Sequence, residues 1–244
     1  MAPASSLWTK ARPVSAGPES VITVLLYQPS LIKTRRSHSP IAVHVGKSPG
    51  KTLYAFEATV RASSRFFDAA LKKVWEEGRS REIHLPEHDP EIVKIYLNWV
   101  DIGELDYEDE TDVERNESGV FYRLIHAFLL GDKLLAPDFK DAVTDAVASV
   151  YADGLWMPGK GLRQILYENT MPGATLRRMV IRQLSMGTPL AVMEDEPQSL
   201  LYDLSHELAE GKSKALRDFK KEVEDCIYHE HQAGAEHCYR NKRH

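Results

Sequence analysis

Cysteine is scarce in this sequence: only two of the 244 residues are cysteines, and both lie near the C-terminal end. Two such residues cannot build a disulfide framework, and their scarcity is typical of proteins that fold in a reducing compartment. The first residues also lack an apolar stretch of signal-peptide length. We therefore expect an intracellular protein, in the cytoplasm, the nucleus or both.

Long apolar runs and an excess of positive charge are missing as well. The apolar runs fall far short of the roughly 18 residues that a membrane-spanning helix needs, so no membrane association is expected. The net charge of −5 argues against a nucleic-acid partner, because proteins that bind nucleic acids usually carry a basic surface. Hydrophobic and charged residues make up 43% and 27% of the chain, as in ordinary globular proteins.

Motifs of known enzyme chemistry are also absent. There is no Gly-x-Ser-x-Gly, and the segment His206–Glu210 lacks the second histidine of a zinc protease. The segment Gly46–Thr52 imitates a phosphate-binding loop. However, only three residues separate its glycines, Pro49 removes an amide, and a strand-like run follows. We predict a protein that is not an enzyme and uses no organic cofactor.

What is present begins with strands. Ile41–Val45 and Thr52–Phe56 alternate in polarity around a turn and predict a β-hairpin. Before it, Val21–Tyr27 has strand character, and three interpretations stay open: an extra edge strand, a strand swapped in a dimer, or an ordered extension without function. The rest of residues 1–36 is rich in Ser, Pro, Ala and Arg and is expected to be a flexible lead-in.

Residues 62–105 predict a helix, a strand and a second helix. Ser63-Ser64 can cap the first helix, Glu82–Leu85 alternates like a strand, and Asp89-Pro90-Glu91 is a typical helix start. The apolar spacing predicts two buried helix faces. Their residues are Phe66, Phe67, Ala70, Leu71 and Val74, and then Ile92, Val93, Ile95, Tyr96, Trp99 and Val100.

Three pieces of this region resemble a known family. They are Ser-Ser-Arg-Phe-Phe-Asp-Ala-Ala-Leu from Ser63, Ile-His-Leu-Pro-Glu-His-Asp-Pro-Glu-Ile from Ile83, and Tyr-Leu-Asn-Trp-Val-Asp-Ile-Gly-Glu-Leu from Tyr96. In order and spacing they resemble the BTB/POZ domain, specifically its fungal type. The resemblance implies an α+β fold, with a small mixed β-sheet covered by a cluster of α-helices, over residues 37–152. A helical extension (153–190) and a linker with an amphipathic helical tail (191–244) would follow.

The resemblance also implies a function. BTB domains are non-catalytic modules for protein–protein interaction that form homodimers or pair with another BTB protein. Many members recruit a cullin scaffold through a hydrophobic-x-Glu signature and act as substrate adaptors of a ubiquitin ligase. Here Val74-Trp75-Glu76-Glu77 offers that signature twice. On the residues alone, Val74 could equally belong to the core, and no recognisable substrate-reading domain accompanies the module, so the adaptor role is the alternative.

One constellation near the C-terminus has metal-binding chemistry. Cys226-x2-His229-x-His231-x6-Cys238, with His237 beside it, supplies the thiol and imidazole ligands that zinc prefers in tetrahedral sites. On one helix Cys226 and His229 would share a face, but His231 would lie about 140° round the helix axis. Convergence therefore requires the helix to end near His229 and the chain to turn back at Gly234. A structural zinc, and with it a zinc-binding regulatory protein, is one interpretation; an exposed tail without a metal is the other.

Two charged stretches complete the sequence. Residues 104–118 are strongly acidic and are expected to form a solvated loop, with a contact for a basic partner as the alternative. Arg177, Arg178 and Arg182 form a basic helix face, which we expect to face solvent rather than to bind an anion.

Overall fold

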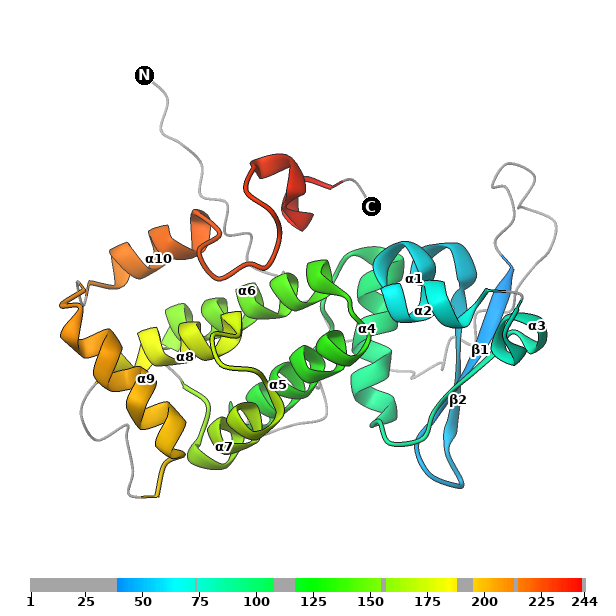
Figure 1. Ribbon diagram of the computed structural model, residues 1–244, viewed down its shortest axis with the longest axis horizontal. Coiled ribbons are helices and arrows are strands. Elements are labelled where there is room, and N and C mark those ends of the chain that lie inside the picture. The colour runs from blue at the N-terminus through cyan, green and yellow to red at the C-terminus, as the bar shows by residue number, and fades with distance from the viewer. Residues whose placement is uncertain are drawn as a thin grey trace, which may run out of the picture. The chain divides into compact units, whose positions relative to one another are not determined.

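The computed structural model of the chain describes residues 39–72, 74–107, 117–154, 157–187, 195–212 and 215–242. The predicted strand Val21–Tyr27 and most of the acidic stretch lie outside these residues. The protein belongs to the α+β class, as predicted: it combines a small mixed sheet with helices that lie between its second and third strands and after the third (Figure 1). No helix within the described ranges is long and apolar enough to cross a membrane.

The sheet has three strands in the order β2-β1-β3. Strands β1 (Pro40–Val45) and β2 (Lys51–Phe56) form the predicted antiparallel hairpin, and β3 (Glu82–Leu85) runs parallel to β1. Alternation of side chains gives each strand one face toward the core. The fully buried residues of β1 and β3 are Ile41, Val43, Val45, Ile83 and Leu85.

The helix predicted to follow Ser63 is shorter than expected, and a separate helix precedes it. Helix α1 (Glu57–Ser63) ends where α2 (Arg65–Ala70) begins, because Ser64 caps α2 with its hydroxyl, which accepts a hydrogen bond from the Phe67 amide. The prediction that Val74 lies on the buried face is wrong, since its side chain is 76% exposed. Helix α2 ends before Leu71, and the chain then folds back on itself. The Lys72 carbonyl oxygen comes so close to Gly78, in α3 (Glu76–Ser80), that a Cβ atom at Gly78 would collide with it.

Helix α4 (Pro90–Ile102) confirms the second prediction. The Asp89 carboxylate caps it by accepting a hydrogen bond from the Glu91 amide at 2.9 Å, and Gly103 ends it with a φ of 77°. Helices α5 (Glu117–Lys133) and α6 (Pro137–Gly154) then form an antiparallel pair beside α4. An aromatic cluster joins these helices to α2. Its members are Phe67, Tyr96, Trp99 and Phe139, with ring centroids 5.1–6.0 Å apart.

The close approach of α5 and α6 depends on a glycine, which permits a test. A methyl group on Gly131 would lie 2.7 Å from Lys140 Cγ and 3.0 Å from Phe139 Cδ1, and Lys140 cannot move freely because Glu230 holds its ammonium group. We expect Gly131→Ala to destabilise the protein by about 1–3 kcal/mol, measured by urea unfolding with an unchanged slope. Gly161→Ala in α7 is the control: nothing lies near its position, so stability should rise by about 0.5–1 kcal/mol.

The C-terminal half continues with four helices that pack on the same core. They are α7 (Lys160–Asn169), α8 (Thr175–Met186), α9 (Gln198–Ala209) and α10 (Leu216–Glu224). In Figure 1, α10 and the segment after it lie along α6. Two short 3-10 turns, Ala235–His237 and Tyr239–Asn241, end the described chain.

The expectation that the arginines of α8 face solvent is wrong for two of the three. Arg177 is 4% exposed and donates to the Tyr167 and Thr170 carbonyls, and Arg182 is 2% exposed. Only Arg178 lies on the surface. A guanidinium group carries five donors, so it can be buried where a ring of acceptors surrounds it.

Candidate metal centre

The Cys/His cluster, meaning Cys226, His229, His231 and Cys238, does not begin on a helix. Helix α10 ends at Glu224, two residues before Cys226, so the helix ends even earlier than the convergence of the ligands requires. Cys226 adopts a left-handed backbone conformation with a φ of 59°, and the His229 amide donates to the Cys226 carbonyl at 3.1 Å. This turn replaces the helix and places His229 beside Cys226 instead of along an axis.

A second turn brings Cys238 back to the same place, as predicted from Gly234. That residue has a φ of 120°, and a Cβ there would collide with the Glu236 side chain. The first 3-10 turn follows immediately, and Cys238 comes directly after it. The chain therefore forms a loop from Cys226 to Cys238, and the two cysteines lie close together where the loop closes.

The structure brings all four predicted ligands together. One potential donor atom from each lies within 4.8 Å of the others. The two sulfur atoms are 3.8 Å apart, and Cys238 Sγ lies 3.7 Å from His229 Nδ1. In a tetrahedral zinc site with ordinary bond lengths, two sulfur ligands are about 3.8 Å apart and a sulfur and a nitrogen about 3.6 Å. The two measured distances among Cys226, Cys238 and His229 thus match a tetrahedral ligand set, and the His231 donor lies within 4.8 Å of the other three.

Hydrogen bonds orient both imidazoles toward the centre of the cluster. His229 Nε2 lies 2.9 Å from Asp145 Oδ1, so this nitrogen carries the proton and Nδ1 presents its lone pair to Cys238. His231 Nδ1 lies 2.7 Å from the Gln232 carbonyl, and its buried Nε2 has no hydrogen-bond partner. A buried nitrogen without a partner is costly, and a metal ion in the cluster would supply one.

Asp145 on α6 connects the cluster to the core. Besides His229, it accepts hydrogen bonds from the Tyr239 hydroxyl and from Arg240, whose Nε is 2.8 Å from Oδ2. Burial of Asp145 opposes its ionisation, but the hydrogen bonds from His229 and Arg240 outweigh that effect, and its pKa lies below the ordinary value. A carboxylate that holds a ligand histidine in this way is the usual outer shell of a zinc site.

The rest of the C-terminal segment, residues 225–242, lies on the same acidic face of α6. The Glu230 amide donates to Asp141 at 2.7 Å, the Glu230 carboxylate pairs with Lys140, and Lys242 pairs with Asp138. Asp141 is fully buried, and burial raises its pKa to about 6. Sequence reasoning missed this face, although three acids at positions 138, 141 and 145 of one helix are an identifiable signal for a polar partner.

The Cys226 thiol holds its proton more strongly than a free cysteine does. Burial raises the pKa of Cys226 to about 11, and its hydrogen bond with Cys238 acts in the same direction. Both cysteines are free, since sulfur atoms 3.8 Å apart are not bonded. A bound metal ion must therefore displace the proton of the Cys226 thiol, which is the normal course of zinc binding by cysteines.

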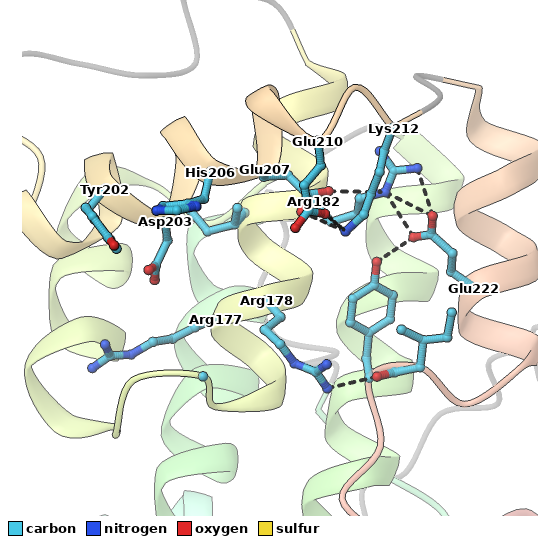
Figure 2. Close-up of a pocket in the computed structure, with 14 residues that line it drawn as sticks. Arg177, Arg178, Arg182, Tyr202, Asp203, His206, Glu207, Glu210, Lys212 and Glu222 are labelled. Atoms are coloured by element: carbon cyan, nitrogen blue, oxygen red, sulfur yellow. Dashed lines mark hydrogen bonds and ion pairs between the residues drawn. The ribbon is translucent and has the colours of Figure 1, made fainter.

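A second concentration of ionisable groups lines a pocket of about 540 Å³ between α8, α9 and the turn after α10. Figure 2 shows that these groups face one another: Arg182 binds Glu222 at 2.9 Å, and Lys212 binds Glu207 at 2.9 Å. The Tyr228 hydroxyl donates to Glu222 as well. This mutual pairing connects α8, α9 and α10 through ion pairs.

The residues predicted to contact a partner are accessible. Val74 and Trp75 are 76% and 59% exposed, and Glu76 and Glu77 are exposed in the first turn of α3. Val74 and Trp75 lie between α2 and α3, and Glu76 and Glu77 begin α3, so all four are far from the Cys/His cluster in the sequence. The structure thus excludes a core role for Val74 and leaves its binding role a prediction.

Comparison with known proteins adds no relative: no protein-family model matches the sequence, and no curated protein matches it. The function of the protein is therefore inferred from its own residues and their geometry.

Proposed function

We propose that the Cys/His cluster binds one structural zinc ion, and that the protein is a non-catalytic module that contacts other proteins. The observation that carries the first part is the convergence of two sulfur and two nitrogen donors within 4.8 Å of one another, with Cys226, Cys238 and His229 already at distances that suit tetrahedral zinc. The ligand atoms would be Cys226 Sγ, His229 Nδ1, His231 Nε2 and Cys238 Sγ.

The donor set favours zinc over other metals and a structural role over a catalytic one. Two thiolates and two imidazoles in a tetrahedral arrangement suit zinc, whereas calcium and magnesium take oxygen ligands. Four protein ligands also leave no position for water or substrate, which is typical of structural sites. In this site zinc would supply charge and fixed geometry.

The fold indicates what such an ion would stabilise. The C-terminal segment buries few apolar side chains, and most of its contacts with α6 are ion pairs and hydrogen bonds. Partly exposed ion pairs contribute little to stability. A zinc ion that closes the loop from Cys226 to Cys238 would hold the ligands, and with them the pairing partners of α6, in place.

Metal analysis tests the proposal directly. Protein purified without chelators should contain about one zinc per chain, because a closed site with two thiolates retains its ion through purification. Zinc far below the amount of protein, with no uptake from a zinc-containing buffer, would contradict it.

The outer shell gives a second prediction. Asp145→Asn keeps the size of the side chain but removes the charge that fixes His229, so we expect zinc affinity to fall by about 10–100-fold. Competition with a chromophoric chelator measures this. Asp138→Asn is the matched control, since Asp138 lies on the same face of α6 but contacts only Lys242 among the charged groups of the segment. Equal affinities of the two variants would remove Asp145 from the site.

The second part of the proposal, the interaction module, has two supports. The described elements include the predicted hairpin, the predicted strand Glu82–Leu85 and the predicted helix from Pro90, in the expected order. The chain also exposes Val74 and Trp75, large apolar side chains next to two acids. We therefore propose self-association or pairing with another BTB protein, which size-exclusion chromatography with light scattering would detect as a mass of two chains.

The adaptor role makes a sharper prediction. If Trp75 and Glu77 contact a cullin scaffold, the double variant Trp75→Ala/Glu77→Ala should lose most cullin co-purification, because aromatic side chains dominate binding energies at interfaces. Its circular dichroism and unfolding midpoint should match the wild type, since both side chains are exposed. Glu168→Ala/Met171→Ala, an exposed pair elsewhere, is the control. Absence of cullin from wild-type preparations would rule out this role.

A further inference from the structure

The outer face of the sheet carries a second group of metal-ligating side chains. Residues of β1 and β3 that point away from the core alternate with the buried ones. His44 on β1 lies directly opposite His84 on β3 in the parallel register, and Glu82 precedes His84 by two residues on the same face. The side chains of His44, Glu82 and His84, here called the sheet cluster, therefore meet on the surface.

The geometry of the sheet cluster is close to that of a ligand set. One potential donor atom from each residue lies within 4.8 Å of the other two. The two imidazoles stack with centroids 4.7 Å apart and an angle of 21° between the rings. His44 Nδ1 lies 3.0 Å from the Thr52 hydroxyl on β2, so a proton on Nδ1 can be donated to Thr52 and Nε2 is left with its lone pair outward.

We propose that His44, Glu82 and His84 bind a second divalent transition-metal ion. Two imidazoles and a carboxylate suit zinc and its neighbours in the first transition row. Around zinc, nitrogen and oxygen donors lie about 3.3 Å apart, so the side chains need to close by no more than about 1.5 Å. Glu82 and His84 are exposed, and rotation of exposed side chains is enough for that movement.

The two sites differ in a way that can be measured. Three protein ligands leave a coordination position open to water, and the sheet cluster contains no thiolate. Its ion should bind more weakly and exchange faster than the ion of the Cys/His cluster. This inference does not depend on the zinc of the Cys/His cluster, because the ligands are separate.

Equilibrium dialysis of the full chain against zinc, after removal of all metal, tests the proposal. We expect two equivalents in the wild type, one tight and one weak, and loss of the weak equivalent alone in His84→Ala. Thr52→Val should keep the ligands but weaken the second site by about tenfold, since Thr52 only positions His44. His206→Ala, which removes an exposed imidazole of α9, is the control and should bind two equivalents.

Cobalt distinguishes the two proposals. Only the Cys/His cluster can give thiolate-to-cobalt charge-transfer absorption, so His231→Ala should lose that signal and still bind the weak equivalent. A wild type that saturates at one equivalent, with charge-transfer absorption, would overturn the sheet site and leave the structural zinc intact. A second equivalent that survives unchanged in His84→Ala would also overturn it.

Discussion

Replacing His231 with alanine is expected to remove zinc from the purified protein, whereas His237→Ala should leave the zinc in place. Both are histidines of the C-terminal segment, but only His231 belongs to the converging ligand set, and its Nε2 is buried without a hydrogen-bond partner. Structural zinc in small domains contributes on the order of 10 kcal/mol to folding at neutral pH, so removal of one ligand should be felt strongly.

The loss should be local, because the rest of the core does not involve the metal. Without zinc the C-terminal segment should detach from α6, and trypsin should cleave faster after Arg240, which Asp145 holds in the intact structure. Tyr239 should also leave Trp99, whose ring centroid is 6.5 Å away, and change the tryptophan fluorescence. Metal analysis, limited proteolysis and fluorescence should report the same difference between the two variants. Equal zinc contents in both would show that the cluster does not hold the ion.

Replacing Glu222 with alanine is expected to destabilise the protein by about 3 kcal/mol, the lower end of the range for a broken buried ion pair. Arg182 is 2% exposed, and two of its guanidinium nitrogens contact Glu222, so the variant removes a close counter-charge from a buried group, whereas Glu207 lies farther away at 3.7 Å. The Tyr228 hydroxyl loses its acceptor as well. Urea unfolding at neutral pH measures the change.

A double variant separates the ion pair from simple packing. Arg182→Met/Glu222→Met removes both charges and keeps apolar volume, and buried pairs replaced in this way often cost nothing. We therefore expect it to be more stable than Glu222→Ala. Glu224→Ala, on the exposed side of α10, should change stability by less than about 0.5 kcal/mol. If Glu222→Ala behaves like Glu224→Ala, the pair does not hold α10 to α8.

Helix and strand positions were largely predictable because their signals are local. The Asp89 cap, the alternation in Ile41–Val45 and the turn at Gly234 each involve neighbouring residues, and each appears in the structure as expected. The four candidate ligands of the Cys/His cluster were predictable for the same reason, since all four lie within one short segment.

The errors arose where distant parts of the chain decide the outcome. Val74 follows an apolar helical spacing, yet the fold-back against Gly78 turns it into solvent. Arg182 looks like a surface residue in α8, but Glu222 from α10 neutralises it in the interior. The sequence around Gly78 and Glu222 gives no sign of these contacts, because the partners meet only after folding.

The sequence by itself determined which donor atoms a metal could use and where the hairpin strands, the strand Glu82–Leu85 and helix α4 would begin. Only the tertiary structure decided that the donors meet: α10 stops early, the chain closes a loop at Cys238, and Asp145 orients His229 from a helix far away in the sequence. The physical reason is that ligand chemistry belongs to single residues, whereas a coordination geometry is a set of distances that packing imposes.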